Sequence, residues 1–188
     1  MSPVRLSLVG AIAWVALACS HPDADAREGQ QQRLREARRT QRQKALPQRT
    51  ECKVTRIADG DSMTCGTAGR VRILMIDAPE LSQGKAGRDS RNTLISLMPI
   101  GTTVFVETDV TSVDRHGRTL AYVYLADGRM VNEEMARSGY VTALVYPPNV
   151  RHSELIRSAV ADARRARRGL WATDFFSCTP RDHRARKC

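Results

Sequence analysis

The chain has 188 residues, of which 27% are charged and 41% hydrophobic, and its formal net charge at pH 7 is +10. This length predicts one ordinary domain with appendages, and the composition excludes a collagen-like or wholly disordered chain. Only 5% of the residues are aromatic, which disfavours a binding platform of many stacked rings. The basic excess points to a polyanionic partner, either nucleic acid or an anionic membrane.

The basic charge is concentrated near the two ends of the chain. Residues 27–50 carry eight basic and two acidic side chains, and residues 179–188 carry four basic and one acidic side chain. The stretch 51–178 has 17 basic and 15 acidic residues, a net charge of only +2. We therefore expect most of the excess charge to lie outside the folded part.

The N-terminal segment has the pattern of an export signal. After Arg5, residues 6–18 form an uncharged, mostly apolar run that is too short to span a bilayer as a helix. Ala16 and Ala18 form an A-x-A cleavage site, so we expect a signal peptide over residues 1–18. The alternative, a buried N-terminal helix, has no amphipathic pattern to support it.

Five cysteines bear on the compartment and on the disulfides. Cys19 directly follows the cleavage site and resembles the lipidated cysteine of bacterial lipoproteins; a soluble periplasmic or secreted protein is the alternative. Lipidation of Cys19 leaves four cysteines, an even number in a compartment that favours pairing. Cys52 and Cys65 fall on adjacent predicted strands, so we pair them, and Cys178 then pairs with Cys188. A cysteine metal site is disfavoured because the sequence has no C-x-x-C motif.

Residues 19–50 are expected to form a basic tether rich in Gln and Arg. Beyond Leu34 and Leu46, residues 27–50 contain almost no large apolar side chain, so they cannot bury enough surface to offset their ordering entropy. The simple interpretation is a solvated tether. The alternative is a tether that also concentrates nucleic acid or contacts anionic lipid.

Regular secondary structure is expected from residue 51 onward. The strand-like segments are 52–57, 62–65, 70–76, 102–110 and 119–125, and the helical segments are 86–98, 132–138 and 153–168. Pro79 stops the third strand because proline cannot donate to a strand ladder. Asn132 can cap the second helix. Five short strands with interspersed helices predict an α+β domain built on a small closed barrel.

Four polar clusters break the apolar pattern of this domain. They are the Asp-Gly-Asp turn 59–61, Arg72 within a hydrophobic strand, the Asp-Ala-Pro-Glu segment 77–80 and the loop 114–118. Each alone has a simple structural explanation as a turn, a strand surface or a loop. Together they offer carboxylates for one hard cation, two arginines for phosphate oxygens and a carboxylate that can take a proton from water. Such a set is suited to the hydrolysis of a phosphodiester, because it offers positioning, electrostatic stabilisation and an activated nucleophile.

These segments resemble the staphylococcal nuclease (thermonuclease) family over residues 51–172, which leaves 173–188 as a basic C-terminal tail. The matching segments are 57–62, 72–80, 114–122, 127–133 and 169–171. The resemblance implies a five-stranded OB-fold β-barrel with three helices. It also implies a Ca²⁺-dependent nuclease that acts on DNA and RNA and leaves 3′-phosphorylated products. We expect a monomer.

The resemblance assigns a metal site by motif position. Asp61 and Asp77 would supply carboxylate oxygens to Ca²⁺, and Ala78 would supply its backbone carbonyl. Asp59 would assist from nearby through water. The family often has Thr where this chain has Ala78, and a carbonyl ligand survives that change.

The resemblance also assigns the catalytic groups. Arg72 and Arg118 would hold the phosphate and stabilise charge in the transition state. Glu80 would act as general base on the attacking water. A non-catalytic nucleic-acid-binding module on the same barrel is the alternative, and the retention of these groups argues against it. A third interpretation makes the basic ends the functional part of a surface-attached interaction protein.

Substrate contacts are expected at the rim of this site. Arg115 and His116 stand where the type member of the family has Lys-Tyr. Leu144 aligns with a tyrosine that contacts a terminal phosphate, and Tyr146 lies close by in the sequence. The resemblance therefore implies Arg115, His116 and Tyr146 as substrate-binding residues.

Overall fold

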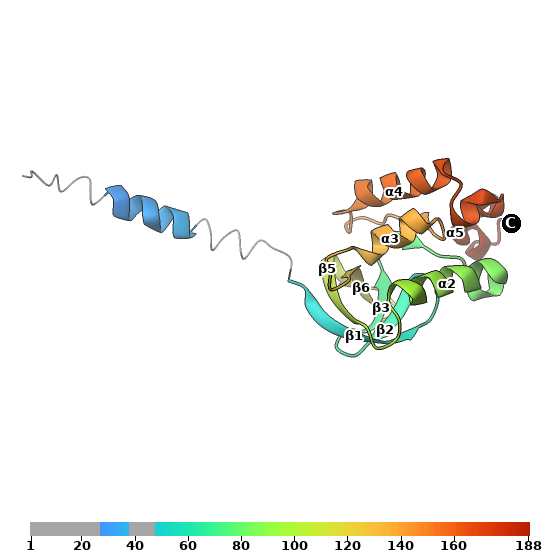
Figure 1. The fold of residues 1–188 in the computed structure, drawn as a ribbon, viewed down its shortest axis with the longest axis horizontal. Helices are drawn as coiled ribbons and strands as arrows, with labels where there is room; N and C mark the ends of the chain where they lie inside the picture. The colour runs from blue at the N-terminus through green and yellow to red at the C-terminus, as the bar shows by residue number, and fades with distance from the viewer. Residues whose placement is uncertain (1–26, 38–47) are drawn as a thin grey trace, which may run out of the picture. The chain divides into compact units, whose positions relative to one another are not determined.

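The computed structural model describes residues 27–37 and 48–188, which belong to two separate compact units. In the first unit, residues 27–37 form a helix (Figure 1). All the side chains of this helix are exposed. The expected signal peptide 1–18 and Cys19 lie outside the described residues. Among the helices of the described ranges, none is long and apolar enough to cross a membrane.

The second unit is built on a closed barrel of five strands. In barrel order these are β1 (Thr50–Ile57), β2 (Ser62–Cys65), β3 (Gly69–Ile73), β6 (Thr119–Tyr124) and β5 (Thr103–Val113). Neighbouring strands pair antiparallel, except for β3 and β6, which run parallel. This topology confirms the expected five-stranded OB-fold barrel of the α+β class (Figure 1).

The alternating pattern of β1 shows how the sequence builds the barrel core. Cys52, Val54 and Ile57 are buried, while the residues between them are exposed. A shift of register between Val54 and Arg56 adds one residue, so the next buried position comes three residues later instead of two. Cys52 is joined to Cys65 across β1 and β2, with 5.7 Å between the Cα atoms.

Three helices accompany the barrel: α2 (Lys85–Leu97), α3 (Val131–Ser138) and α4 (Ser153–Arg165). The short strands β4 (Ile76–Asp77) and β7 (Thr142–Ala143) form a separate pair. Asn132 does not cap α3; the helix begins after Met130, and the Asn132 side chain is buried. Its amide donates to Leu74 O (2.8 Å) and accepts from Val123 N–H (2.9 Å), which ties α3 to the barrel.

The folded unit begins before residue 51, because Arg49 is anchored to the barrel. Its Nε lies 3.1 Å from Oε2 of Glu107, a carboxylate that is 1% exposed. Arg151 reaches the other oxygen of Glu107 at 2.6 Å. One of the arginines counted in the expected tether therefore neutralises a buried charge of the barrel.

Residues 173–188 form secondary structure, whereas their composition predicts only a basic tail. The chain forms the 3-10 helices η2 (Gly169–Ala172) and η3 (Phe175–Ser177) and then the helix α5 (Pro180–Arg184). Phe176 is buried, and its ring centroid lies 4.4 Å from that of Trp171. This apolar contact holds the segment in place, although its basic composition gives no indication of such a contact.

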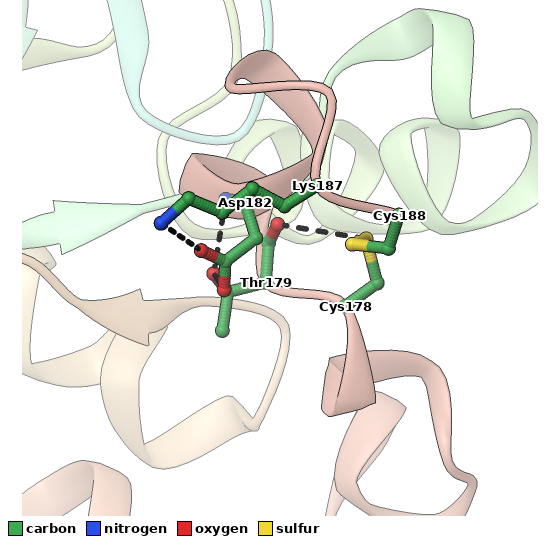
Figure 2. The surroundings of a disulfide bond; sticks show 5 residues. All are labelled: Cys178, Thr179, Asp182, Lys187 and Cys188. Carbon is green, nitrogen blue, oxygen red and sulfur yellow. Dashed lines mark hydrogen bonds and ion pairs between the residues drawn. A yellow bond between two sulfur atoms is a disulfide. The ribbon is translucent and has the colours of Figure 1, made fainter.

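A disulfide closes the C-terminal segment around α5. Cys178 and Cys188 are joined, with 6.0 Å between their Cα atoms (Figure 2). Inside this ring, the Thr179 hydroxyl accepts a hydrogen bond from Asp182 N–H (3.2 Å) and so caps α5. Lys187 lies 3.9 Å from the Asp182 carboxylate. The ring and the cap hold a helix that is too short to persist alone.

Candidate active site

One open cavity of about 710 Å³ gathers the four polar clusters of the sequence. The turn 59–61 connects β1 to β2, Arg72 lies on β3, residues 77–80 run from β4 onward, and the loop 114–118 connects β5 to β6. All the predicted catalytic, metal-binding and substrate-binding residues line this cavity except Asp77, which is buried. The barrel thus brings together groups that the sequence places far apart.

The turn 59–61 is held tightly against the start of the segment 77–80. Asp61 Oδ2 accepts a hydrogen bond from Ala78 N–H at 2.7 Å, and Asp59 Oδ1 accepts one from Asp61 N–H at 2.9 Å. A Cβ at Gly60 would lie 2.8 Å from the Ala78 Cβ and would collide with the Ser90 hydroxyl. Only glycine therefore lets the turn come close enough for Asp61 to reach Ala78.

Arg72 joins the carboxylates to the backbone of the barrel. Its Nη1 donates to Ile73 O (2.7 Å) and Ile76 O (2.9 Å), which closes the turn between β3 and β4. Its Nη2 lies 3.0 Å from Asp61 Oδ2 and 3.3 Å from Asp77 Oδ1. One guanidinium thus positions both aspartates that the sequence assigns to a metal site.

Two carboxylates of this region have raised pKa values, mainly because they are buried. Burial and, to a smaller extent, the nearby Asp61 carboxylate raise the pKa of Asp59 to about 7, although the charge of Arg72 opposes this shift. Burial also raises the pKa of Asp77, although a hydrogen bond from Arg184 opposes this effect. Such groups gain from added positive charge, which is a property of cation-binding sites.

Asp114 orders the loop that carries Arg118. Asp114 Oδ1 accepts from the N–H groups of His116 (2.8 Å) and Arg118 (2.9 Å), and Oδ2 accepts from Arg118 Nε (2.7 Å). Burial raises the pKa of Asp114, but the hydrogen bonds from Arg118 and His116 outweigh it and hold this pKa below its usual value. Within the described residues, the two terminal nitrogens of Arg118 have no hydrogen-bond partner, so they can bind a ligand.

Glu80 stands at the entrance of the 3-10 helix η1 (Leu81–Gln83). Its N–H donates to Gln83 Oε1 at 2.9 Å, and its side chain is 38% exposed. A Cβ at Gly87 would lie 2.7 Å from the carbonyl carbon of Glu80, so the first turn of α2 packs directly on this backbone. Close packing fixes the main chain of Glu80 while its carboxylate can reach the cavity.

The predicted substrate contacts lie along the same cavity. Arg115 Nε is 3.1 Å from His116 Nε2, and Arg70 donates to the backbone carbonyl of His116 at 2.6 Å. Tyr146 is 59% exposed, so its ring is accessible to a ligand. This rim combines positive charge with an open aromatic face, a combination suited to single-stranded nucleic acid.

Sequence reasoning missed Arg184, which reaches the site from α5. Its Nη2 donates to both carboxylate oxygens of Asp77, at 2.7 and 2.9 Å, and its Nη1 donates to Glu80 Oε1 at 2.8 Å. The only sequence signal near it is the cysteine pair Cys178 and Cys188, whose ring encloses the residue. This signal indicates an ordered loop but does not indicate where the arginine goes.

The carboxylate and carbonyl oxygens of the site are suitable ligands for a hard cation, but in this structure the oxygens of Asp77 are bound to an arginine. Asp61 and Asp77 share one arginine, and burial raises the pKa of Asp59 and of Asp77. Among the described residues, however, no three Asp, Glu, His or Cys side chains are grouped so that they could hold a metal ion. Both oxygens of Asp77 instead bind Arg184.

Known proteins share this sequence pattern. The family described as "Staphylococcal nuclease homologue" matches residues 70–173. The thermonuclease of Staphylococcus hyicus is 31% identical over 131 residues, which are 64% of this chain and 75% of that protein. The thermonuclease of Staphylococcus intermedius is 33% identical over 129 residues, 63% of this chain and 74% of that protein. A protein of Escherichia coli O157:H7 named an uncharacterized endonuclease is 34% identical over 125 residues, 64% of this chain and 76% of its own length.

Proposed function

Because the chain belongs to the staphylococcal nuclease family, we propose that it is an exported, Ca²⁺-dependent endonuclease that leaves 3′-phosphorylated products from DNA and RNA. The family and the names of the relatives support the broader statement that the protein is a nuclease. The observation that carries the proposal is one cavity lined by Arg72, Arg118 and Glu80 together with Asp61.

The two arginines are proposed to bind and stabilise the phosphate. Arg118 presents two terminal nitrogens that lack partners in the described structure, in a loop already ordered by Asp114. Arg72 is fixed by backbone carbonyls and needs no rearrangement to present its charge. Donors that are preorganised toward developing charge lower the barrier most, because no reorganisation is needed during the reaction.

Glu80 is proposed to accept a proton from the attacking water. As the water oxygen bonds to phosphorus, its proton passes to a Glu80 carboxylate oxygen. The bond from phosphorus to the 5′ oxygen breaks, and the 5′ oxygen leaves with the bonding electrons and takes up a proton from solvent. The exposure of Glu80 and its position on the cavity wall support this role. The developing negative charge on the phosphate oxygens would be met by Arg72 and Arg118.

The cation would be held by the carboxylates of Asp61 and Asp77 and the carbonyl of Ala78, with Asp59 assisting through water. When bound, Ca²⁺ supplies positive charge to the phosphate and to the attacking oxygen. The raised pKa values of Asp59 and Asp77 support a need for such charge.

Export is proposed from the sequence of residues 1–18. The two cysteine pairs, Cys52 with Cys65 and Cys178 with Cys188, are at disulfide distance, which suits a protein that folds in an oxidising compartment. A lipid on Cys19 would anchor the nuclease to a membrane, and a soluble periplasmic or secreted protein is the alternative.

Hydrolysis of single-stranded DNA by the purified protein, first with Ca²⁺ and then with excess chelator, tests this proposal. We expect cleavage that stops on chelation and products that carry 3′-phosphates. If the protein binds single-stranded DNA but cleaves it under neither condition, the non-catalytic binding module is correct and the enzyme proposal is wrong. Cleavage that continues in chelator contradicts the Ca²⁺ dependence alone.

A further inference from the structure

We propose that Arg184 competes with the catalytic cation for Asp77, so that the disulfide-closed segment 173–188 is a built-in restraint on this nuclease. The inference rests on the proposed function, because it takes Asp77 as a cation ligand and Glu80 as the general base. It adds to that function a determinant of how much Ca²⁺ the enzyme needs.

Both terminal nitrogens of the Arg184 guanidinium donate hydrogen bonds to carboxylates. Two hydrogen bonds go to the two oxygens of Asp77, at 2.7 and 2.9 Å, and a third goes to Glu80 at 2.8 Å. Hydrogen bonds between ionised partners, as here, are roughly twice as strong as hydrogen bonds between neutral groups. The arginine thus neutralises the same carboxylate oxygens that a hard cation would need.

Cation binding to Asp77 requires Arg184 to move. Asp77 also contacts Arg72, so a cation added beside both arginines would bring three positive groups to one carboxylate. Arg72 is anchored by two backbone carbonyls and its side chain is only 14% exposed. Arg184 is 40% exposed, so its charge can return to water at lower cost. Arg184 is therefore the group that a cation would displace.

The same contact restrains Glu80. While Glu80 Oε1 accepts a hydrogen bond from Arg184, the arginine takes an acceptor position of the carboxylate that a water molecule would otherwise use. Movement of Arg184 would free both a metal ligand and the general base in one step. The restraint therefore acts on two parts of the proposed mechanism together.

The disulfide between Cys178 and Cys188 helps to keep the restraint in place. α5 has five residues, too few to remain helical alone, and the bond between Cys178 and Cys188 closes a ring around it. Phe176 fixes the start of the segment on Trp171, but the ring fixes its other end. Opening the ring would allow Arg184 to leave the carboxylates more often.

Ca²⁺ affinity measured by isothermal titration calorimetry tests the inference directly. We expect Arg184→Gln to bind Ca²⁺ about tenfold more tightly than the wild type, because a charge-assisted contact no longer has to be broken. Arg181→Gln is the matched control. Arg181 lies exposed on the same helix, and its replacement changes the net charge equally. The control should bind Ca²⁺ like the wild type.

A second variant covers the case in which Arg184→Gln fails to fold. The double variant Cys178→Ser with Cys188→Ser keeps Arg184 and the Cys52–Cys65 bond, and circular dichroism reports whether it folds. We expect it to bind Ca²⁺ severalfold more tightly than the wild type and to need less Ca²⁺ for half-maximal cleavage.

Each result separates this inference from the proposed function. If the folded variants bind Ca²⁺ with wild-type affinity and cleave DNA normally, the competition is wrong and the nuclease proposal stands. If no form of the protein binds Ca²⁺, the proposed metal site is wrong, and the inference is overturned with it. An equal gain in Arg181→Gln would show that net charge, and not the contact of Arg184, sets the affinity.

Discussion

Arg72 and Arg184 contact the same buried carboxylate, Asp77, from two very different parts of the molecule. Arg72 lies on barrel strand β3, within the residues that match the family, and its tip binds two backbone carbonyls. Arg184 lies beyond residue 173, where the family match ends, and its tip binds two carboxylates. Arg72 is therefore part of the barrel structure, while Arg184 comes from a segment outside the family match and is the one that we propose a cation displaces.

The largest expected effect concerns the rate and a third arginine, Arg118, whose terminal nitrogens lack partners in the part of the chain that the structure describes. Arg118→Ala should lower kcat about 10³-fold or more, because charge on the phosphate would lose a preorganised donor. The melting temperature should change little. Arg157→Ala, on the exposed face of α4, is the control and should cleave normally. An unchanged rate in Arg118→Ala would show that the assignment of the phosphate site is wrong.

Stability should separate Arg72 from Arg184. Arg72→Ala leaves Asp61 without its ion-pair partner and opens the turn before β4, so we expect a loss of about 3–5 kcal/mol in the free energy of unfolding. Arg184→Ala should cost only about 1.4 kcal/mol, which corresponds to the expected tenfold gain in Ca²⁺ affinity, since its side chain is partly exposed and Asp77 keeps Arg72. Urea unfolding monitored by circular dichroism measures both. Equal losses would contradict the distinction between the two arginines.

Asp59 tests what happens to a carboxylate that has no arginine in direct contact within the described structure. Its pKa is raised from 3.8 to about 7 in the folded protein, so the folded state holds the proton between these values and the unfolded state does not. In chelator, the contribution of Asp59 to the free energy of unfolding should therefore be greatest below pH 4. This contribution should be lost as the pH rises through 7.

Replacement of Asp59 checks that pH dependence. Asp59→Asn should remove the contribution of Asp59 to this loss of stability and should stabilise the protein at pH 8 by about 2 kcal/mol. This figure is about half of the free energy that corresponds to the full pKa shift, because solvent screens a partly exposed group. Thermal denaturation at pH 5 and pH 8 in chelator measures the difference. A pH profile identical to that of the wild type would place the origin of the dependence elsewhere.

The smallest global effect is expected in the anchor of the C-terminal segment. Phe176→Ala removes the ring that packs on Trp171, so residues 173–188 should exchange their amide hydrogens faster. The barrel should unfold at nearly the wild-type urea concentration, because its core does not include this ring. Hydrogen exchange read by mass spectrometry resolves the two regions. A large drop in global stability would show that the segment is an integral part of the barrel.

The barrel could be predicted because its information is local. Alternation in β1 and the sequence of the turn 59–61 indicate a strand and a tight turn without reference to distant residues. The predicted strand 70–76 is nevertheless interrupted after Ile73, and Met75 adopts a left-handed backbone with φ 64°. The Arg72 side chain binds the carbonyls of residues 73 and 76, so these are not free to continue a ladder.

The C-terminal part of the site could not be predicted, because its decisive contact joins residues 107 positions apart. No periodicity or motif links Arg184 to Asp77. The basic composition of residues 179–188 favours a solvated tail, and the single buried ring of Phe176 is too weak a signal to overturn it. The prediction that Asn132 caps a helix was wrong for a similar reason. The preference of Asn for helix caps is a local property, whereas its hydrogen bonds to Leu74 and Val123 are tertiary contacts.

The contact between Arg184 and Asp77 also couples two distant properties of the protein. If Arg184 weakens Ca²⁺ binding by a given factor, thermodynamic reciprocity requires Ca²⁺ to weaken the docking of Arg184 by the same factor. A saturating cation would then loosen α5, and a protease would cut residues 179–188 more readily with Ca²⁺ than without it. The protease sensitivity of the C-terminal segment would in this way depend on whether the metal site is occupied.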